Sequence, residues 1–131
     1  MAAVESYPDD LKYHHDHDWA RIDGDEAVLG ITWFAADALG ELVHFEPPAQ
    51  GATLTKDSSY GEVESVKAVS DVMAPLSGEV LEVNQKVVDA PETVNDDPYG
   101  DGWLVRIRLS DPSEVGSLLD LAAYKQVLAE Q

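Results

Sequence analysis

The stretch from Val63 to Val72 is close to a mirror image of itself, and this symmetry constrains the fold more than any other feature of the chain. Folded about the bond between Lys67 and Ala68, it places similar residues opposite one another: Val66 and Val69, Ser65 and Ser70, Glu64 and Asp71, Val63 and Val72. Cross-strand pairing of this kind is typical of two antiparallel strands joined by a two-residue turn. The sequence therefore predicts a β-hairpin with Lys67 and Ala68 at its tip.

The predicted tip departs from the rules that its flanks obey. A tight hairpin turn favours residues that tolerate positive φ, such as Asn-Gly, and Ala is a poor choice there. Glu64 opposite Asp71 also places like charges together, which costs stability. Such local conflicts often mark functional sites. We interpret Lys67 as an amine held out in water to be modified; the alternative is an ordinary loop lysine in a stretch that mirrors by chance.

Turn signals recur along the chain, and the apolar runs between them are short. This pattern favours a mainly β fold in a single domain over residues 1–131. The last predicted strand alternates apolar residues with Arg106 and Arg108, as expected of a half-buried strand. The predicted strands are residues 19–22, 27–31, 42–45, 59–66, 69–73, 78–83 and 103–109.

Two parts of the chain are predicted to be helical. Thr32 is placed to cap a short helix over residues 33–39 that Gly40 would end. Near the C-terminus, Asp111 followed by proline predicts a helix to about residue 119, because proline is favoured in the first turn. Asp120 would cap a second helix over residues 121–128, whose apolar stripe would pack on the sheet.

Composition limits the classes of function. The chain of 131 residues has 8 Lys and Arg against 26 Asp and Glu, a net charge of −18. This excess of acid argues against binding to nucleic acids or anionic membranes and favours partners with basic patches. Without cysteine there is no disulfide, thiolate metal site or cysteine nucleophile. No basic leader is visible, so we expect a cytoplasmic protein, or a mitochondrial matrix protein if a leader has been removed.

Short motifs follow one another in a characteristic order between Leu11 and Leu128. They are Leu11-Lys-Tyr13, His17-Asp-Trp19, Gly30-Ile-Thr32, Ala38-Leu-Gly-Glu41, Phe45-Glu-Pro47, Gly61-Glu-Val-Glu-Ser-Val-Lys-Ala68, Ser70-Asp71, Ala74-Pro75, Ser77-Gly-Glu-Val80, Glu82-Val-Asn84, Val94-Asn95, Asp97-Pro-Tyr-Gly100, Gly102-Trp103 and Tyr124. Each is weak alone, but their joint order and spacing are specific. Together they make the chain resemble the H-protein family of the glycine cleavage system.

The resemblance implies a lipoyl-type flattened β-barrel or sandwich, a barrel-sandwich hybrid, with short helices that include a C-terminal helical segment. Lys67 matches the lysine that carries lipoate in amide linkage. The family is a carrier and not an enzyme. Its arm takes an aminomethyl group from the pyridoxal-phosphate glycine decarboxylase and passes it to a tetrahydrofolate-dependent aminomethyltransferase, and dihydrolipoamide dehydrogenase then reoxidises the arm. Lipoate-attaching enzymes are further expected partners, and a monomer is expected.

Acidic residues are the other predicted site residues. Glu64 and Asp71 flank Lys67 and would orient it for the attaching enzyme, unless they are only solvated charges. The lability of a loaded aminomethyl group suggests a shallow cleft beside the hairpin that excludes water from the docked arm. By the resemblance, Asp18 and Asp71 line this cleft, with Asp16 as a further candidate. The alternative is that these residues are ordinary surface acids.

The chain departs from the family pattern at His14-His15-Asp16-His17-Asp18, where the family usually has Thr-x-x-His-Glu, and at Trp33, where an acidic or polar residue is usual. Imidazoles and carboxylates at this density can hold zinc, copper or nickel. On a strand, however, neighbours alternate between faces, so His15 and His17 would share one face and the two acids the other. We therefore predict a polar strand entry and no metal site.

Three other functions are alternatives to the carrier of the glycine cleavage system. A lipoyl domain of a 2-oxoacid dehydrogenase usually has Asp-Lys-Ala at the tip, where this chain has Val-Lys-Ala. A biotin carrier brackets its lysine with methionines, and Met73 lies too far from Lys67. The third is a small acidic binding or metal-buffering protein that is never modified. No nucleophile–base arrangement or phosphate loop supports an enzyme.

Overall fold

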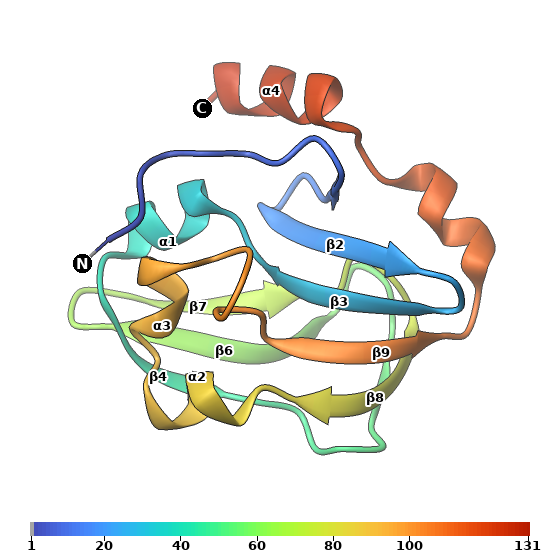
Figure 1. Ribbon diagram of the computed structural model, residues 1–131, viewed down its shortest axis with the longest axis horizontal. Coiled ribbons are helices and arrows are strands. Elements are labelled where there is room, and N and C mark those ends of the chain that lie inside the picture. The colour runs from blue at the N-terminus through green and yellow to red at the C-terminus, as the bar shows by residue number, and fades with distance from the viewer. Residues whose placement is uncertain (1) are drawn as a thin grey trace.

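The computed structural model describes residues 2–131 and consists of two β-sheets with short helices around them (Figure 1). The larger sheet has the strand order β1-β2-β3-β9-β8-β5, and the smaller has the order β4-β6-β7. The paired strands run antiparallel. The strands are Lys12–Tyr13 (β1), Asp18–Asp23 (β2), Glu26–Ile31 (β3), Leu42–Glu46 (β4), Thr53–Leu54 (β5), Ser59–Ser65 (β6), Val69–Met73 (β7), Gly78–Val83 (β8) and Val105–Leu109 (β9).

The mainly β class predicted from the sequence is confirmed. β7 and β8 have the predicted bounds, and β9 begins at Val105 instead of Trp103. Inward Val105 and Ile107 are fully buried while Arg108 is exposed, as the alternation predicts. β1 and β5 were not predicted, because a strand of 2 residues leaves no alternation to detect.

The main hydrophobic core lies between the two sheets. Leu29 and Ile107 of the larger sheet pack in it with Phe45, Val63 and Val72 of the smaller sheet, and none of the five is more than 1% exposed. Burial of such apolar surface is the dominant favourable term in folding. Because β6 and β7 each contribute to this core, the hairpin that they form has a firm base.

A second hydrophobic cluster covers the outer face of the larger sheet. Tyr13 of β1 stacks on Tyr124 of α4 (Leu121–Ala129), with the ring centroids 4.5 Å apart, and Trp19 and Leu11 complete the buried cluster. Figure 1 shows α4 and the N-terminal segment lying over β2. The prediction of a helix capped by Asp120 is confirmed, because its carboxylate accepts the N–H of Ala123.

The predicted helix after Thr32 is also present. α1 (Trp33–Leu39) begins with the Thr32 hydroxyl accepting the N–H of Ala35, and it ends at Gly40, whose φ is 85°. Glycine adopts positive φ without the steric cost that other residues incur, so it is well suited to end a helix.

The remaining helices differ from the prediction. The segment after Asp111 forms a 3₁₀ helix, Pro112–Ser117, and not an α-helix that continues to residue 119. Two short helices, α2 (Gln85–Asp89) and α3 (Thr93–Asp96), were not predicted. None of the helices in residues 2–131 has the length and hydropathy needed to cross a membrane.

Candidate functional site

The β6–β7 hairpin presents Lys67, but its register differs from the predicted one. The hairpin turns about the bond between Val66 and Lys67, and the observed pairs are Glu64 with Val69, Val63 with Ser70, Glu62 with Asp71 and Gly61 with Val72. The predicted pairing of Glu64 with Asp71 is therefore wrong. Because the register differs by an even number of residues, each side chain stays on the face that was predicted for it.

Ser65 is the physical reason for this register. Its backbone N–H donates to the carbonyl of Ala68 at 2.8 Å, and its hydroxyl accepts the N–H groups of Lys67 and Ala68 at 3.3 and 3.2 Å. The side chain is 4% exposed, so these bonds are shielded from water. None of Val66, Lys67 and Ala68 has positive φ. The serine thus closes the turn without the Asn-Gly chemistry that a primed turn needs.

Lys67 lies on the surface of the protein at this tip. Both it and Val66 are exposed, Val66 at 88%. Lys56 forms an ion pair with Asp57 and Lys86 with Asp101, whereas within residues 2–131 Lys67 forms none. Its amine is therefore accessible to a modifying enzyme.

A shallow pocket of about 230 Å³ lies beside the tip. Leu39, Gly40 and Glu41, at the end of α1, form one side of it, and Ser65, Val66 and Lys67 form the other. Gly40 faces the lysine stem closely, since a Cβ built at this position would lie 3.5 Å from Cε of Lys67. A hollow beside the hairpin was predicted, but Asp16, Asp18 and Asp71 do not line this one.

Glu64 and Asp71 both lie near the tip, on exposed positions of the smaller sheet. Asp71 faces Glu62, and Glu62 also faces Glu46 on β4, so three carboxylates form a row across the sheet. Like charges opposite one another are destabilising, which means that this row carries an unfavourable electrostatic cost. The sequence did not identify Glu46 and Glu62, because only the observed register brings them beside Asp71.

Asp18 is buried, in contrast to the surface position that was expected. It is 2% exposed, and its carboxylate accepts a hydrogen bond from the backbone of Met73. Burial, and next the charge of Asp16, raise its pKa well above the ordinary value. Met73 ends β7 away from the tip, on the order of 20 Å from Lys67 at about 3.3 Å per residue. The structure therefore does not bring Asp18 together with Lys67.

Residues 14–17 form a turn between β1 and β2, and the predicted alternation of a strand is wrong there. The N–H of His14 donates to the carbonyl of Asp18, the N–H of His17 donates to the carbonyl of His14, and His17 has a φ of 72°. His17 lies beside α4, with Nδ1 2.8 Å from the hydroxyl of Tyr124, which is 2.9 Å from the hydroxyl of Thr32. Burial lowers the pKa of His17.

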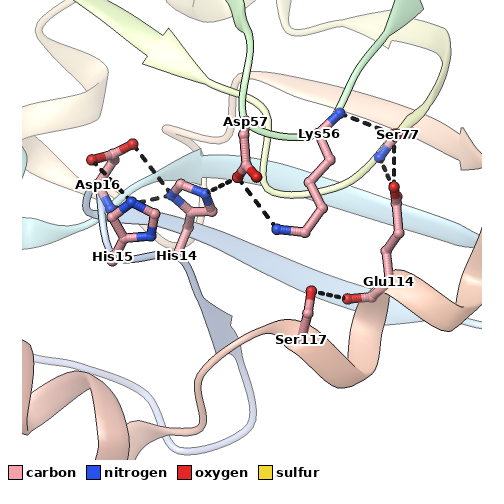
Figure 2. Close-up of polar contacts among 8 residues, drawn as sticks. All are labelled: His14, His15, Asp16, Lys56, Asp57, Ser77, Glu114 and Ser117. Atoms are coloured by element: carbon pink, nitrogen blue, oxygen red, sulfur yellow. Dashed lines mark hydrogen bonds and ion pairs between the residues drawn. The ribbon is translucent and has the colours of Figure 1, made fainter.

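His14 is the most buried histidine of this turn, and its ring is fixed at both nitrogens (Figure 2). Nδ1 accepts the N–H of Asp16 at 3.1 Å, so the ring proton is on Nε2, which donates to Oδ1 of Asp57 at 2.6 Å. This bond lowers the pKa of Asp57. Asp57 lies between β5 and β6, and the contact therefore joins the two turns.

Comparison with known proteins identifies the family. The profile of the glycine cleavage H-protein family matches residues 11–131. The chain belongs to this family. It is 50% identical to the glycine cleavage system H protein of Symbiobacterium thermophilum, over 92% of this chain and 94% of that protein. It is also 50% identical to that of Halorhodospira halophila, over 98% of this chain and 99% of that protein.

The fold agrees with a solved member of the family. The crystal structure of the H protein from Mycobacterium marinum matches with a TM-score of 0.87 and 42% identity, over 94% of this chain and 99% of that one. The predicted lipoyl-type barrel-sandwich fold is thereby confirmed. Membership of the family implies a lipoyl-carrier role in glycine cleavage, as a subunit that works with the other enzymes of that system.

Proposed function

We propose that Lys67 carries lipoate in amide linkage and that the chain shuttles the aminomethyl group of glycine. The observation that carries this proposal is the tip itself: an exposed lysine that forms no ion pair with any group in residues 2–131, on a turn closed by a buried serine. The position corresponds to the lipoylated lysine in the family motif. Lipoylation replaces the ammonium charge with a neutral amide, and the modified chain gains the sulfurs that a sequence with no cysteine lacks.

The hairpin suits a carrier because it separates a rigid part from a mobile part. Val63 and Val72 anchor the two strands in the main core, each at 1% exposure. The long side chain of Lys67 is exposed and starts from the fixed turn, so an arm attached to it is free to swing into solvent. A bound lipoyl group would supply a disulfide, one sulfur of which takes the aminomethyl group, and it would become a dithiol only once that group has been passed on. The protein contributes the fixed starting point from which one arm can enter several active sites.

Three enzymes would use this arm in turn. The pyridoxal-phosphate glycine decarboxylase loads it, the tetrahydrofolate-dependent aminomethyltransferase unloads it, and dihydrolipoamide dehydrogenase reoxidises the dithiol. The chain itself would provide no catalytic residue. Its net charge of −18 favours rapid encounter with basic docking surfaces, and such steering weakens with salt. Association rates that do not change with ionic strength would contradict the steering.

Between transfers, the loaded arm would lie against the protein, which would shelter the aminomethyl group from water. Asp71 is exposed on β7 whereas Asp18 is buried, so of the two carboxylates Asp71 is the more accessible to an arm folded back from Lys67. A carboxylate can pair with the protonated amine of the loaded group. Asp71→Asn should speed the loss of the aminomethyl group from purified, loaded protein, with Asp18→Asn measured beside it. Unchanged loss from both variants would remove the sheltering role and leave the carrier role intact.

The deciding experiment is the intact mass of the protein after expression with lipoate, followed by peptide mapping. We expect the addition of one lipoyl group, on Lys67. Lys67→Arg should fold normally and gain no mass. A lipoyl group on Lys12, Lys56, Lys86 or Lys125 of the unmutated protein would overturn the assignment. A chain that stays unmodified with an active attaching enzyme would instead favour an acidic binding protein.

A further inference from the structure

His14, His15 and Asp16 bring three potential metal ligands together in the β1–β2 turn, although the sequence analysis predicted no metal site. One ligand atom from each residue lies within 4.8 Å of the other two. Nδ1 of His14 is 3.7 Å from Oδ2 of Asp16, and Nε2 of His15 is 3.6 Å from Oδ1 of Asp16. Figure 2 shows the carboxylate of Asp16 facing the two imidazole rings.

The distances from the two imidazoles to Asp16 fit ligands that share one cation better than they fit hydrogen bonds between the side chains. A separation of 3.6 to 3.7 Å between nitrogen and oxygen is too long for a hydrogen bond. Two ligand atoms of a tetrahedral zinc ion, each about 2.0–2.2 Å from the metal, lie roughly 3.4 Å from one another. His15 and Asp16 are 67% and 43% exposed, so their side chains are free to close the small remaining distance.

His14 already has the arrangement of a metal ligand. A ligating histidine usually donates its other ring N–H to a carboxylate, which fixes the tautomer and aims the free nitrogen at the metal. Here Nε2 of His14 donates to Asp57, which leaves the lone pair of Nδ1 facing Asp16. An ion would replace the 3.1 Å bond from the Asp16 N–H to this nitrogen. Because Asp16 is exposed, water can take over that N–H.

We propose that His14 Nδ1, His15 Nε2 and the Asp16 carboxylate bind a first-row divalent cation, with zinc as the best match. Two imidazoles and one carboxylate suit zinc and its neighbours, whereas magnesium and calcium prefer oxygen ligands alone. Backbone bonds from His14 to Asp18 and from His17 to His14 close the turn around the three ligands beforehand, which lowers the entropy lost on binding. A fourth position stays open to water. The site is separate from Lys67 and does not depend on the lipoyl carrier role.

The test is calorimetric titration of the untagged protein with zinc, at physiological salt and with excess magnesium to occupy diffuse carboxylate sites. We expect one equivalent to bind and the thermal midpoint of unfolding to rise, because the ion binds the folded state. His15→Ala removes an exposed ligand and should nearly abolish binding without harming the fold. Asp57→Asn removes only the negative charge of the outer partner, since the amide oxygen can still accept from His14, and asparagine tolerates the positive φ of this position, so affinity should fall by about 10-fold, the low end of the range for outer partners.

Two controls make the test specific. His44→Ala removes an exposed histidine that also lies beside an acid, Glu46, and it should leave zinc binding unchanged. Lys67→Arg should bind zinc as the parent does. The proposal is overturned by an absence of saturable binding, by full binding in His15→Ala and Asp16→Asn, or by competition from magnesium that reveals an adventitious ion only.

Discussion

Two of the hairpin turns of this protein, β1–β2 and β6–β7, differ in where their side chains find hydrogen-bond partners. At the β6–β7 tip, the hydroxyl of Ser65 binds the N–H groups of its own turn, and Lys67 contacts solvent. In the β1–β2 turn, His14 binds Asp57 and His17 binds Tyr124, partners that lie far along the chain. A turn closed from within leaves its exposed residues free for chemistry. A turn closed by distant partners contributes to holding the fold together.

The largest effect that separates the two turns is expected from Lys67→Arg. This change keeps a positive charge at an exposed position, so the free energy of unfolding should change by less than about 0.5 kcal/mol. Glycine-dependent aminomethyl transfer in a reconstituted system should be lost completely, because arginine cannot form the lipoyl amide. Residual transfer after confirmed absence of lipoate would show that the arm does not start at this residue.

Tyr124→Phe should have the next largest effect, and it should lower stability without changing lipoylation. It removes a hydroxyl within hydrogen-bonding distance of both His17 and Thr32, and the loss of such buried bonds costs about 1–3 kcal/mol. Urea unfolding should report this loss, while lipoylation of Lys67 stays at the parental level. If lipoylation fell together with stability, the two turns would not be independent.

Ser65→Ala tests the β6–β7 tip in place of the β1–β2 turn. The backbone bond between Ser65 and Ala68 remains, but the two N–H groups that the hydroxyl accepts lose their partner, at a cost of about 1 kcal/mol. The attaching enzyme should then modify a less ordered tip more slowly. The initial rate of lipoylation at low enzyme concentration is the measurement, with Ser70→Ala as the matched control, because the Ser70 hydroxyl donates to the carbonyl of Asp71 and not to the turn. Equal rates in the two variants would contradict an ordering role for Ser65.

The main expected effect of Asp18→Asn is on the pH dependence of the free energy of unfolding. Burial raises the pKa of Asp18 well above 3.8, so the folded state holds this proton more tightly than the unfolded state does. Its contribution to stability is therefore lost as pH rises from about 4 towards the raised pKa. The variant lacks this group, and its free energy of unfolding should fall less across that range. Parallel curves would show that Asp18 ionises as it does in the unfolded chain.

Local patterns predicted the fold where the cause of structure is local. The alternation of β9 and the Thr32 cap of α1 were visible in the sequence because each depends on neighbouring residues. The exact pairing of the hairpin was missed, since the hydroxyl of Ser65 and not residue symmetry selects the turn. α2 was missed because it is short, although Asn84 caps it.

The candidate site residues also differ in whether the sequence alone could place them. The position of Lys67 at an exposed hairpin tip could be predicted because its motif is continuous in the sequence. The burial of Asp18 was missed because it depends on Met73, which lies on another strand. The β1–β2 turn was mistaken for a strand because His17, and not glycine or asparagine, adopts the positive φ there. No local signal marks such a residue when partners such as Tyr124 hold it in place.

The contact between His17 and Tyr124 can form only late when the chain is synthesised from its N-terminus. The bonds that close the Lys67 tip join residues that leave the ribosome together, from Ser65 to Ala68. His17 leaves early, yet its partner Tyr124 is made near the end of the chain. The first turn to be synthesised thus completes its native contacts only near the end of synthesis. A nascent chain stalled before Tyr124 would have the local bonds of this turn but would lack the contact of His17 with Tyr124, while every residue of the Lys67 tip is already present.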